Sequence, residues 1–221
     1  MALDHRRQPG LTIKQTVAEC FGEIQNLIQL GTQHAELPSA GSTLRLAFDV
    51  VFILNEYLGL MSDLVRKHGG VVDKYIGDSV MAIYGIATRP ETGARQALET
   101  AADMMAELDK LNERLSGEVA ETLRMGIGIH AGPAILGRIG GGASAGLTAL
   151  GDTVNIASRL ESATKDLETM LAVSDAVTTF AGADPSRLRR EEITLRGRTN
   201  AITVYAASTA GEVRQALSEH V

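Results

Sequence analysis

The segment from Leu147 to Leu160, LTALGDTVNIASRL, places two side chains suited to phosphoryl chemistry on one short predicted helix. Asn155 and Arg159 are four residues apart, so they share one helix face and point at the same target. A guanidinium beside a neutral carboxamide suits a phosphorus centre whose oxygens gain charge during transfer. A surface helix with both side chains in solvent explains this spacing about equally well. We expect Asp152 or Thr153 to cap the helix.

A second segment, Lys67 to Gly85, brings a carboxylate to the tip of a predicted hairpin. Its sequence, KHGGVVDKYIGDSVMAIYG, predicts strands at Val71–Ile76 and Val80–Tyr84 that are joined by a tight Gly-Asp turn. Asp78 therefore lies at the tip, and Lys74 lies a few residues back on the incoming strand. For Lys74 alone, an exposed strand lysine is the commoner explanation.

Small residues mark the places where these elements pack closely. Ala157 and Ser158 let another backbone approach the helix that carries Asn155 and Arg159. A third segment, LRMGIGIHAGPAILGRIG from Leu123 to Gly140, predicts two strands whose glycines permit close backbone contact. The helix itself has apolar anchors at Val154, Ile156 and Leu160.

An alternating α/β pattern surrounds these segments. Apolar residues at helical spacing predict a helix over Thr43–Arg66, and Pro90 opens a second long helix. The remaining predicted elements are a loop at Gly140–Gly146, strands at Met170–Ser174, Glu192–Arg196 and Ala201–Ala206, and a helix at Asp175–Phe180. We expect one catalytic domain at residues 12–207, with an N-terminal extension at 1–11 and a loosely attached tail at 208–221.

The composition bounds the function class. A chain of 221 residues can bury a real core, and its single cysteine, Cys20, excludes an intrachain disulfide framework. No apolar run reaches membrane-spanning length, so we expect a cytoplasmic protein without a membrane segment. The net charge of −6 disfavours a nucleic-acid partner, whereas a nucleotide whose charge is neutralised by metal stays compatible.

The three segments together resemble the catalytic domain of class III nucleotidyl cyclases. The resemblance runs from about Leu54 to Tyr205 and rests on three motifs: K-x-x-G-D at Lys74 to Asp78, GIGIHAG at Gly126 to Gly132, and GDTVNIASRLE at Gly151 to Glu161. It implies an α/β (α+β) fold with a ferredoxin-like βαββαβ core and additional C-terminal elements. It also implies a homodimer of head-to-tail domains whose active sites draw on both chains.

The resemblance further implies an adenylyl cyclase that converts ATP to 3′,5′-cyclic AMP and pyrophosphate. In this reaction the ribose 3′-hydroxyl attacks the α-phosphate with the help of two divalent cations, Mg²⁺ or Mn²⁺. By this similarity Asp78 is a metal ligand, Asn155 orients the ribose and Arg159 stabilises the transition state. The resemblance assigns the base to Lys74 and Thr148, because an ammonium can donate to adenine N1 and a hydroxyl can accept from the adenine amino group. It assigns Arg196 to the binding of the terminal phosphates of ATP.

The first metal element is the most divergent part of the resemblance. The best match, TVAECFGEIQNLI, puts Glu23 at the position of the metal-binding aspartate and Ile24 at the backbone carbonyl donor. Apolar spacing over Ile13 to Ile28 also fits an amphipathic helix, although the sheet needs a first strand and we favour the strand. A glutamate in this place predicts weak activity that prefers manganese. The alternative is a degenerate cyclase that binds a nucleotide or a partner without turnover.

Overall fold

The computed structural model describes residues 13–22, 40–116, 122–139, 146–194 and 201–218. Its first six elements are β1 (Ile13–Gly22), α2 (Ala40–Lys67), β2 (Val71–Ile76), β3 (Ser79–Tyr84), α3 (Pro90–Leu115) and β4 (Met125–Ile139). This order confirms the predicted ferredoxin-like βαββαβ core. The chain continues through β5 (Gly146–Leu150), α4 (Asp152–Asp166), β6 (Leu171–Ser174), α5 (Asp175–Ala181), the 3-10 helix η2 (Pro185–Arg187), β7 (Arg189–Ile193), β8 (Ile202–Ala207) and α6 (Ala210–Leu217).

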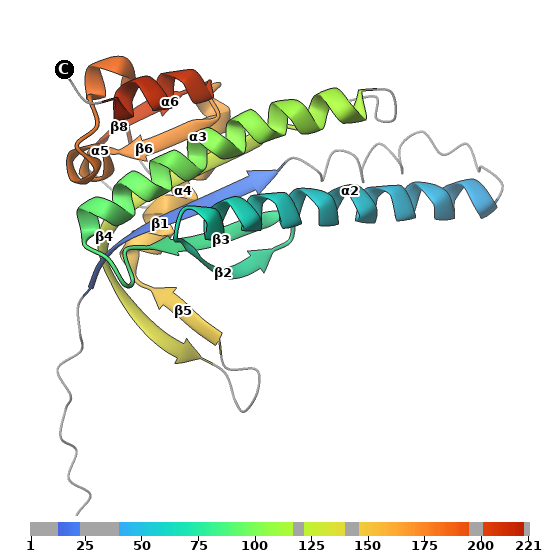
Figure 1. Ribbon diagram of the computed structural model, residues 1–221, viewed down its shortest axis with the longest axis horizontal. Helices are drawn as coiled ribbons and strands as arrows, with labels where there is room; N and C mark the ends of the chain where they lie inside the picture. The colour runs from blue at the N-terminus through green and yellow to red at the C-terminus, as the bar shows by residue number, and fades with distance from the viewer. Residues whose placement is uncertain (1–12, 23–39, 117–121, 140–145, 195–200, 219–221) are drawn as a thin grey trace, which may run out of the picture.

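The strands form one sheet in the order β2-β3-β1-β4-β6-β8-β7, and β5 pairs separately with β4 (Figure 1). β1 lies inside this sheet, antiparallel to both neighbours, and Cys20 stands opposite Val80 on β3 and Ile127 on β4. The strand interpretation is therefore confirmed for Ile13–Gly22, and the helical alternative is wrong for this stretch. Residues 23–28, which complete the predicted element, lie outside the described residues.

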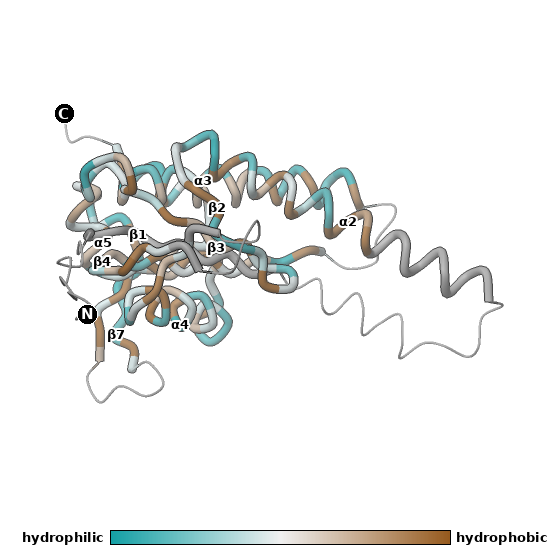
Figure 2. The backbone as a smooth tube through the Cα atoms, turned by 90° about the horizontal axis from the view of Figure 1, so that it is seen from below, coloured by the Kyte–Doolittle hydropathy of each residue, from teal (hydrophilic) through white to brown (hydrophobic). Residues whose placement is uncertain are grey.

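Helices cover both faces of the sheet (Figure 2). α2, α3, α5 and α6 pack on one face around the larger apolar core, and α4 packs on the other. β3 is buried between these layers, since its side chains alternate between the two cores as a strand requires. The larger core takes Val80, Ala82 and Tyr84, and the core beneath α4 takes Met81 and Ile83.

β4 departs from the prediction. The segment from Leu123 to Gly140 was expected to form two strands, but Met125–Ile139 is one continuous strand. Its register explains the difference, because the strand pairs with β1 up to Ala134 and with β5 from Ile135 onward. The HAGP sequence therefore marks a change of pairing partner and not a turn. The second half of β4 and β5 together form a two-stranded arm (Figure 1).

The C-terminal segment was predicted to be a loosely attached tail, which is wrong. α6 begins with a capping box in which Thr209 and Glu212 each accept a hydrogen bond from the other's backbone amide. Its apolar face is buried, and the Arg95 guanidinium of α3 donates to the carbonyl oxygen of Leu217 at 3.0 Å. The buried residues of this face are Val213, Ala216 and Leu217.

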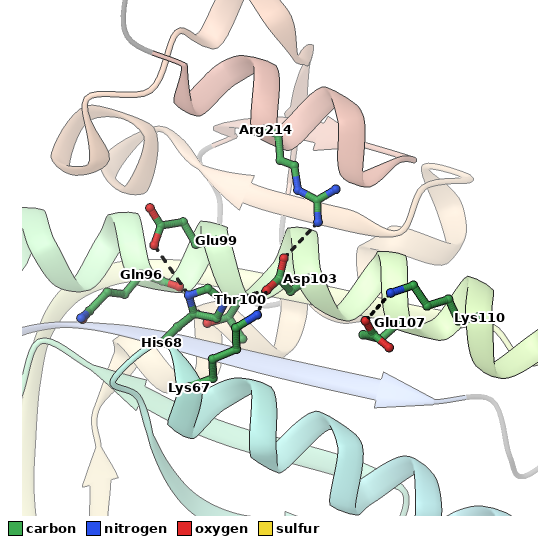
Figure 3. A network of polar contacts seen from close by, with 9 residues as sticks. All are labelled: Lys67, His68, Gln96, Glu99, Thr100, Asp103, Glu107, Lys110 and Arg214. Carbon is green, nitrogen blue, oxygen red and sulfur yellow. Dashed lines mark hydrogen bonds and ion pairs between the residues drawn. The ribbon is translucent and has the colours of Figure 1, made fainter.

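A charged cluster joins three of these helices around Asp103 of α3 (Figure 3). Its carboxylate accepts from Lys67 at 2.7 Å and from His68 at 2.9 Å, both at the end of α2, and from Arg214 of α6 at 3.0 Å. Burial alone would raise the pKa of Asp103, but these hydrogen bonds outweigh it and lower the pKa well below its ordinary value. The cluster fixes the end of α2, from which the chain enters β2.

Other predicted boundaries differ by a few residues. The strand expected at Glu192–Arg196 begins earlier, at Arg189, and its last paired residue is Ile193. This outer strand carries charged side chains on both sides of its pleat, so apolar alternation does not mark its start. Among the described residues, none of the helices combines the length and apolar character that a bilayer-spanning segment requires.

Candidate functional site

The glycines of β4 determine where α4 can lie. A Cβ atom added to Gly128 would collide with the carbonyl oxygen of Ala157 and the amide nitrogen of Glu161, both on the α4 backbone. At Gly132 it would lie 2.8 Å from Thr153 Oγ1, and at Gly126 it would collide with the hydroxyl of Thr164. The predicted close approach of Ala157 is therefore present, and the GIGIHAG run is the surface on which the helix rests.

α4 buries one face and exposes the other. Ile156, Ala157 and Leu160 are buried against the sheet. Asn155 and Arg159 lie on the opposite side of the helix, where Asn155 is exposed and Arg159 is half-buried. Within the described residues, neither side chain forms a hydrogen bond or ion pair. The described part of one chain therefore does not fix the orientation of these two side chains.

The predicted cap of α4 is wrong. The helix begins at Asp152, so Gly151 is its N-cap, with a φ of 136°, and no side chain caps the first turn. Thr153 instead donates its hydroxyl to the carbonyl oxygen of Pro133 on β4 at 2.6 Å. Asp152 lies in the first turn, where a carboxylate interacts favourably with the positive end of the helix dipole. The hydroxyl therefore ties the helix to the sheet and does not terminate it.

Lys74 and Thr148, predicted from distant segments, are in direct contact. The Lys74 ammonium donates to Thr148 Oγ1 at 2.5 Å, although the residues lie 74 positions apart. Thr148 is buried on β5, whereas the Lys74 side chain is 43 % exposed. The pair therefore presents hydrogen-bonding groups at the surface of the sheet. Such a site can bind the hydrogen-bonding edge of a flat ring.

A β-bulge on β2 makes this contact possible. Val72 pairs with Ala82 and Lys74 pairs with Met81, so Asp73 is an extra residue between two consecutive pairs. In a regular strand Lys74 would share the face of Val72, which packs toward α2 and α3. The bulge places Lys74 opposite Met81 instead, on the face covered by α4. Asp73 enters the contact as well, because its carboxylate accepts from the Thr148 hydroxyl at 2.8 Å and from the Ala149 amide at 3.3 Å.

Asp73 was not predicted as a site residue. Its side chain is 1 % exposed and its Oδ2 lies 3.5 Å from the Lys74 ammonium. Strand alternation places neighbouring residues on opposite faces, so the sequence pattern gave no reason to join Asp73 with Lys74. The bulge that brings Lys74 onto the face of Asp73 has no residue signature that could have indicated it.

Asp78 lies at the tip of the β2–β3 hairpin, as predicted, and is only 6 % exposed. Because Cys20 pairs with Val80, the end of β1 at Gly22 lies beside this turn. Asp78 also borders a cavity of about 700 Å³, whose polar lining residues come chiefly from α3, α4 and the segment before β4 and include Asn112, Arg124 and Glu161. A carboxylate thus meets the end of the first strand at the wall of a cavity.

Comparison with known proteins identifies the arrangement. The family model of the adenylate and guanylate cyclase catalytic domain matches residues 12–208. The chain belongs to this family. An adenylate cyclase of Anabaena cylindrica is 32% identical over 164 residues, which cover 71% of this chain and 32% of the relative. Adenylate cyclase 1 of Rhizobium meliloti is 33% identical over 158 residues, which cover 71% of this chain and 24% of the relative. The cyclase domain therefore spans about a quarter to a third of these relatives.

Solved cyclase structures share its fold. The guanylyl cyclase Cya2 superposes with a TM-score of 0.73 at 23% identity, covering 91% of this chain and 95% of Cya2. The adenylyl cyclase CyaB from P. aeruginosa gives 0.69 at 23% identity, with 87% and 92% of the two chains covered. One of these structures is a guanylyl and the other an adenylyl cyclase, so the fold does not determine the base.

The cyclase domain offers chemistry that suits a hard divalent cation. Asp78 provides carboxylate oxygens, which are the ligands that Mg²⁺ and Mn²⁺ prefer. The described residues contain no cluster of three or more side chains able to hold a metal. Glu23 and Ile24, the other predicted ligands, lie outside the described residues, as does Arg196. Asp78 is therefore the one predicted ligand among the described residues, and its oxygens fit such a cation.

Proposed function

We propose that this domain converts ATP to 3′,5′-cyclic AMP and pyrophosphate as a homodimer, by attack of the ribose 3′-hydroxyl on the α-phosphate. The contact between Lys74 and Thr148 is the observation that carries the choice of ATP. Lys74 keeps N–H groups for the N1 acceptor of adenine, and the Thr148 oxygen can accept from the adenine amino group. The names of the Anabaena and Rhizobium relatives, both adenylate cyclases, agree with this choice.

The reaction needs charge compensation around the phosphates. We assign Arg159 to the transition-state charge and Asn155 to the ribose, because both lie on the exposed side of α4 and have no partner within the described residues. Arg196, which lies outside the described residues, is assigned to the terminal phosphates. Two divalent cations held by Asp78, Glu23 and the Ile24 carbonyl would activate the hydroxyl and neutralise the phosphates when bound. The start of the catalytic domain at residue 12 is part of the same proposal, and α6 extends the domain past the predicted end at residue 207.

A second copy of the chain would complete the site. Two apolar side chains of the arm, Ile135 and Leu150, are directly paired and are 68% and 47% exposed. Tyr75 and Ile76 on the outer strand β2 are exposed as well. Paired exposed apolar groups on an arm and an edge strand are typical of interfaces. In such a dimer each site would take its base contacts from one chain and its metal ligands from the other.

A degenerate cyclase that only binds a nucleotide is the second candidate. The observation in its favour is the first metal element, where Asn26, Leu27 and Ile28 replace the glycine, phenylalanine and threonine that the resemblance leads us to expect. A domain of this kind would keep Lys74, Asn155 and Arg159 for recognition and lose turnover.

Metal-dependent turnover separates the two candidates. The purified chain is assayed for cyclic AMP and cyclic GMP with Mg²⁺ or Mn²⁺, next to equilibrium binding of ATP. We expect weak, manganese-preferring formation of cyclic AMP, because glutamate places its oxygens one methylene further from the backbone than aspartate does. Glu23→Asp should improve turnover with magnesium, and Glu23→Ala should abolish it.

The control is Glu91→Ala, which removes an exposed carboxylate from the first turn of α3 and should leave turnover unchanged. This turn lies at the opposite end of the helix from the residues that line the Asp78 cavity. ATP binding without turnover under either metal would establish the degenerate binder. If Glu23→Ala keeps the activity of the wild type, Glu23 is not a ligand and the first metal carboxylate lies elsewhere in the chain.

A further inference from the structure

The buried carboxylate of Asp73 has no part in the reaction proposed above, yet it contacts both base-reading residues. Its Oδ2 accepts hydrogen bonds from the Thr148 hydroxyl and from the Ala149 amide, and it lies 3.5 Å from the Lys74 ammonium. A side chain that is 1 % exposed on an edge strand has no solvent to satisfy it. The β-bulge, which moves Lys74 onto the face of Asp73, therefore joins a buried acceptor to the pair that we assign to the base.

The direction of these hydrogen bonds matters because a threonine hydroxyl can rotate. It carries one proton and two lone pairs, so it can present either a donor or an acceptor to a ligand. An ionised carboxylate only accepts, so the bond to Asp73 takes the hydroxyl proton of Thr148. The bond from Lys74 takes one lone pair. The second lone pair is what remains for a ligand.

We infer that Asp73 is the specificity-determining residue that fixes Thr148 as an acceptor and thereby selects adenine over guanine. The inference rests on the proposed function of the Lys74–Thr148 pair. With Asp73 in place the pair offers donors from Lys74 beside an acceptor from Thr148, which complements adenine N1 and its amino group. Guanine presents the reverse order, an N–H at N1 beside a carbonyl oxygen. Its N–H would face the donors of Lys74, and its carbonyl oxygen would face the acceptor of Thr148.

The test is the ATP to GTP ratio of kcat/KM in Asp73→Leu. Leucine keeps the approximate size of the side chain but has no acceptor, so the Thr148 hydroxyl proton is free to turn toward guanine. Asparagine would not serve, because its carbonyl oxygen can still accept from Thr148 and Ala149. We expect the ratio to fall about tenfold, chiefly through poorer use of ATP and better use of GTP. Equilibrium binding of ATP and GTP is measured in parallel, so that the preference for one base can be measured even when turnover is slow. Asp63→Leu is the matched control, since its carboxylate on α2 is 78% exposed and its replacement should leave the ratio unchanged.

A double-mutant cycle with Thr148→Val identifies the route of the effect. Valine removes the hydroxyl that Asp73 orients, so Asp73→Leu should change the ratio in the wild-type background and not in Thr148→Val. If Asp73→Leu does not fold, Asp73→Ala removes the carboxylate with a smaller side chain and is read in the same way. A purely structural role would lower the melting temperature and reduce the use of both nucleotides equally.

The outcomes separate the two proposals. A wild type that prefers ATP, together with an unchanged ratio in Asp73→Leu, overturns the role of Asp73 and leaves the proposed function standing. A ratio that falls equally in the Thr148→Val background also overturns it, because Asp73 then acts by another route. A wild type without preference for ATP overturns the base choice itself, and the role of Asp73 with it.

Discussion

Substitution of Gly128 by alanine tests whether the close contact between β4 and α4 sets the position of the reactive groups. The added Cβ would come closer than 3.0 Å to three backbone atoms of α4, a separation that real Cβ atoms essentially never show. Backbone atoms cannot rotate away as a side chain can, so the helix must retreat by about 1 Å. Overpacking of this kind costs about 1–3 kcal/mol of stability. A displacement of about 1 Å of a positioning element can cost roughly 100-fold in rate.

We therefore expect Gly128→Ala to stay folded at low temperature and to lose about 100-fold in kcat for cyclic AMP formation. Thermal denaturation measures the loss of stability, and turnover per folded molecule measures the loss of position. Gly132→Ala provides a graded comparison, because its collision is with the Thr153 side chain and the second substitution Thr153→Ala should relieve it in part. The control is Gly59→Ala on α2, where an added Cβ meets nothing within 4 Å and should raise stability slightly.

Two results would refute this reasoning. Gly128→Ala with wild-type kcat would mean that the position of α4 does not limit the reaction. An equal loss in Gly59→Ala would mean that the rate responds to any glycine substitution and not to the contact with α4.

The remaining predictions concern the base, the dimer and the charged cluster. Lys74→Glu should weaken ATP use and improve relative GTP use, because it replaces a donor by an acceptor at the purine edge; equal losses for both nucleotides would remove Lys74 from the base site. Inactive Asp78→Ala and Arg159→Ala chains should regain partial activity when mixed, since one hybrid site has every group, and no recovery despite demonstrated chain exchange would place each site within one chain. The lowered pKa of Asp103 means that its stabilisation is present above its ordinary value of 3.8 and is lost as the pH falls below it. Asp103→Asn should cost about 1–3 kcal/mol of unfolding free energy at neutral pH and flatten its decline below pH 4, as measured by denaturation; the same acid dependence in both proteins would contradict the assignment.

The sequence predicted the order of the core elements because local signals marked them. Helical apolar spacing indicated α2, Pro90 indicated the start of α3, and the Gly-Asp turn placed Asp78 at a hairpin tip. Asn155 and Arg159 could be placed on one helix face for the same reason. These features depend on residues within one or two turns of each other, where spacing alone determines geometry.

The parts that failed depend on distant contacts. β4 is one strand because β5 takes over the pairing at Ile135, and a sequence does not mark a change of partner. α6 was missed because its short apolar face becomes informative only when it packs on α3. Asp73 was missed because the bulge that brings Lys74 onto its face of the sheet has no residue signature of its own.

Base recognition and catalysis have different structural support in this chain. The contacts among Asp73, Lys74 and Thr148 are all made within one chain, between adjacent parts of the sheet. Asn155 and Arg159, in contrast, are held only through the backbone position of α4, and within the described residues no side chain orients them. A group without an orienting partner loses rotamer entropy when it engages a substrate. On our proposal the choice of base is therefore built into each subunit, whereas the rate depends on the assembly that brings α4 against the phosphates of the shared site.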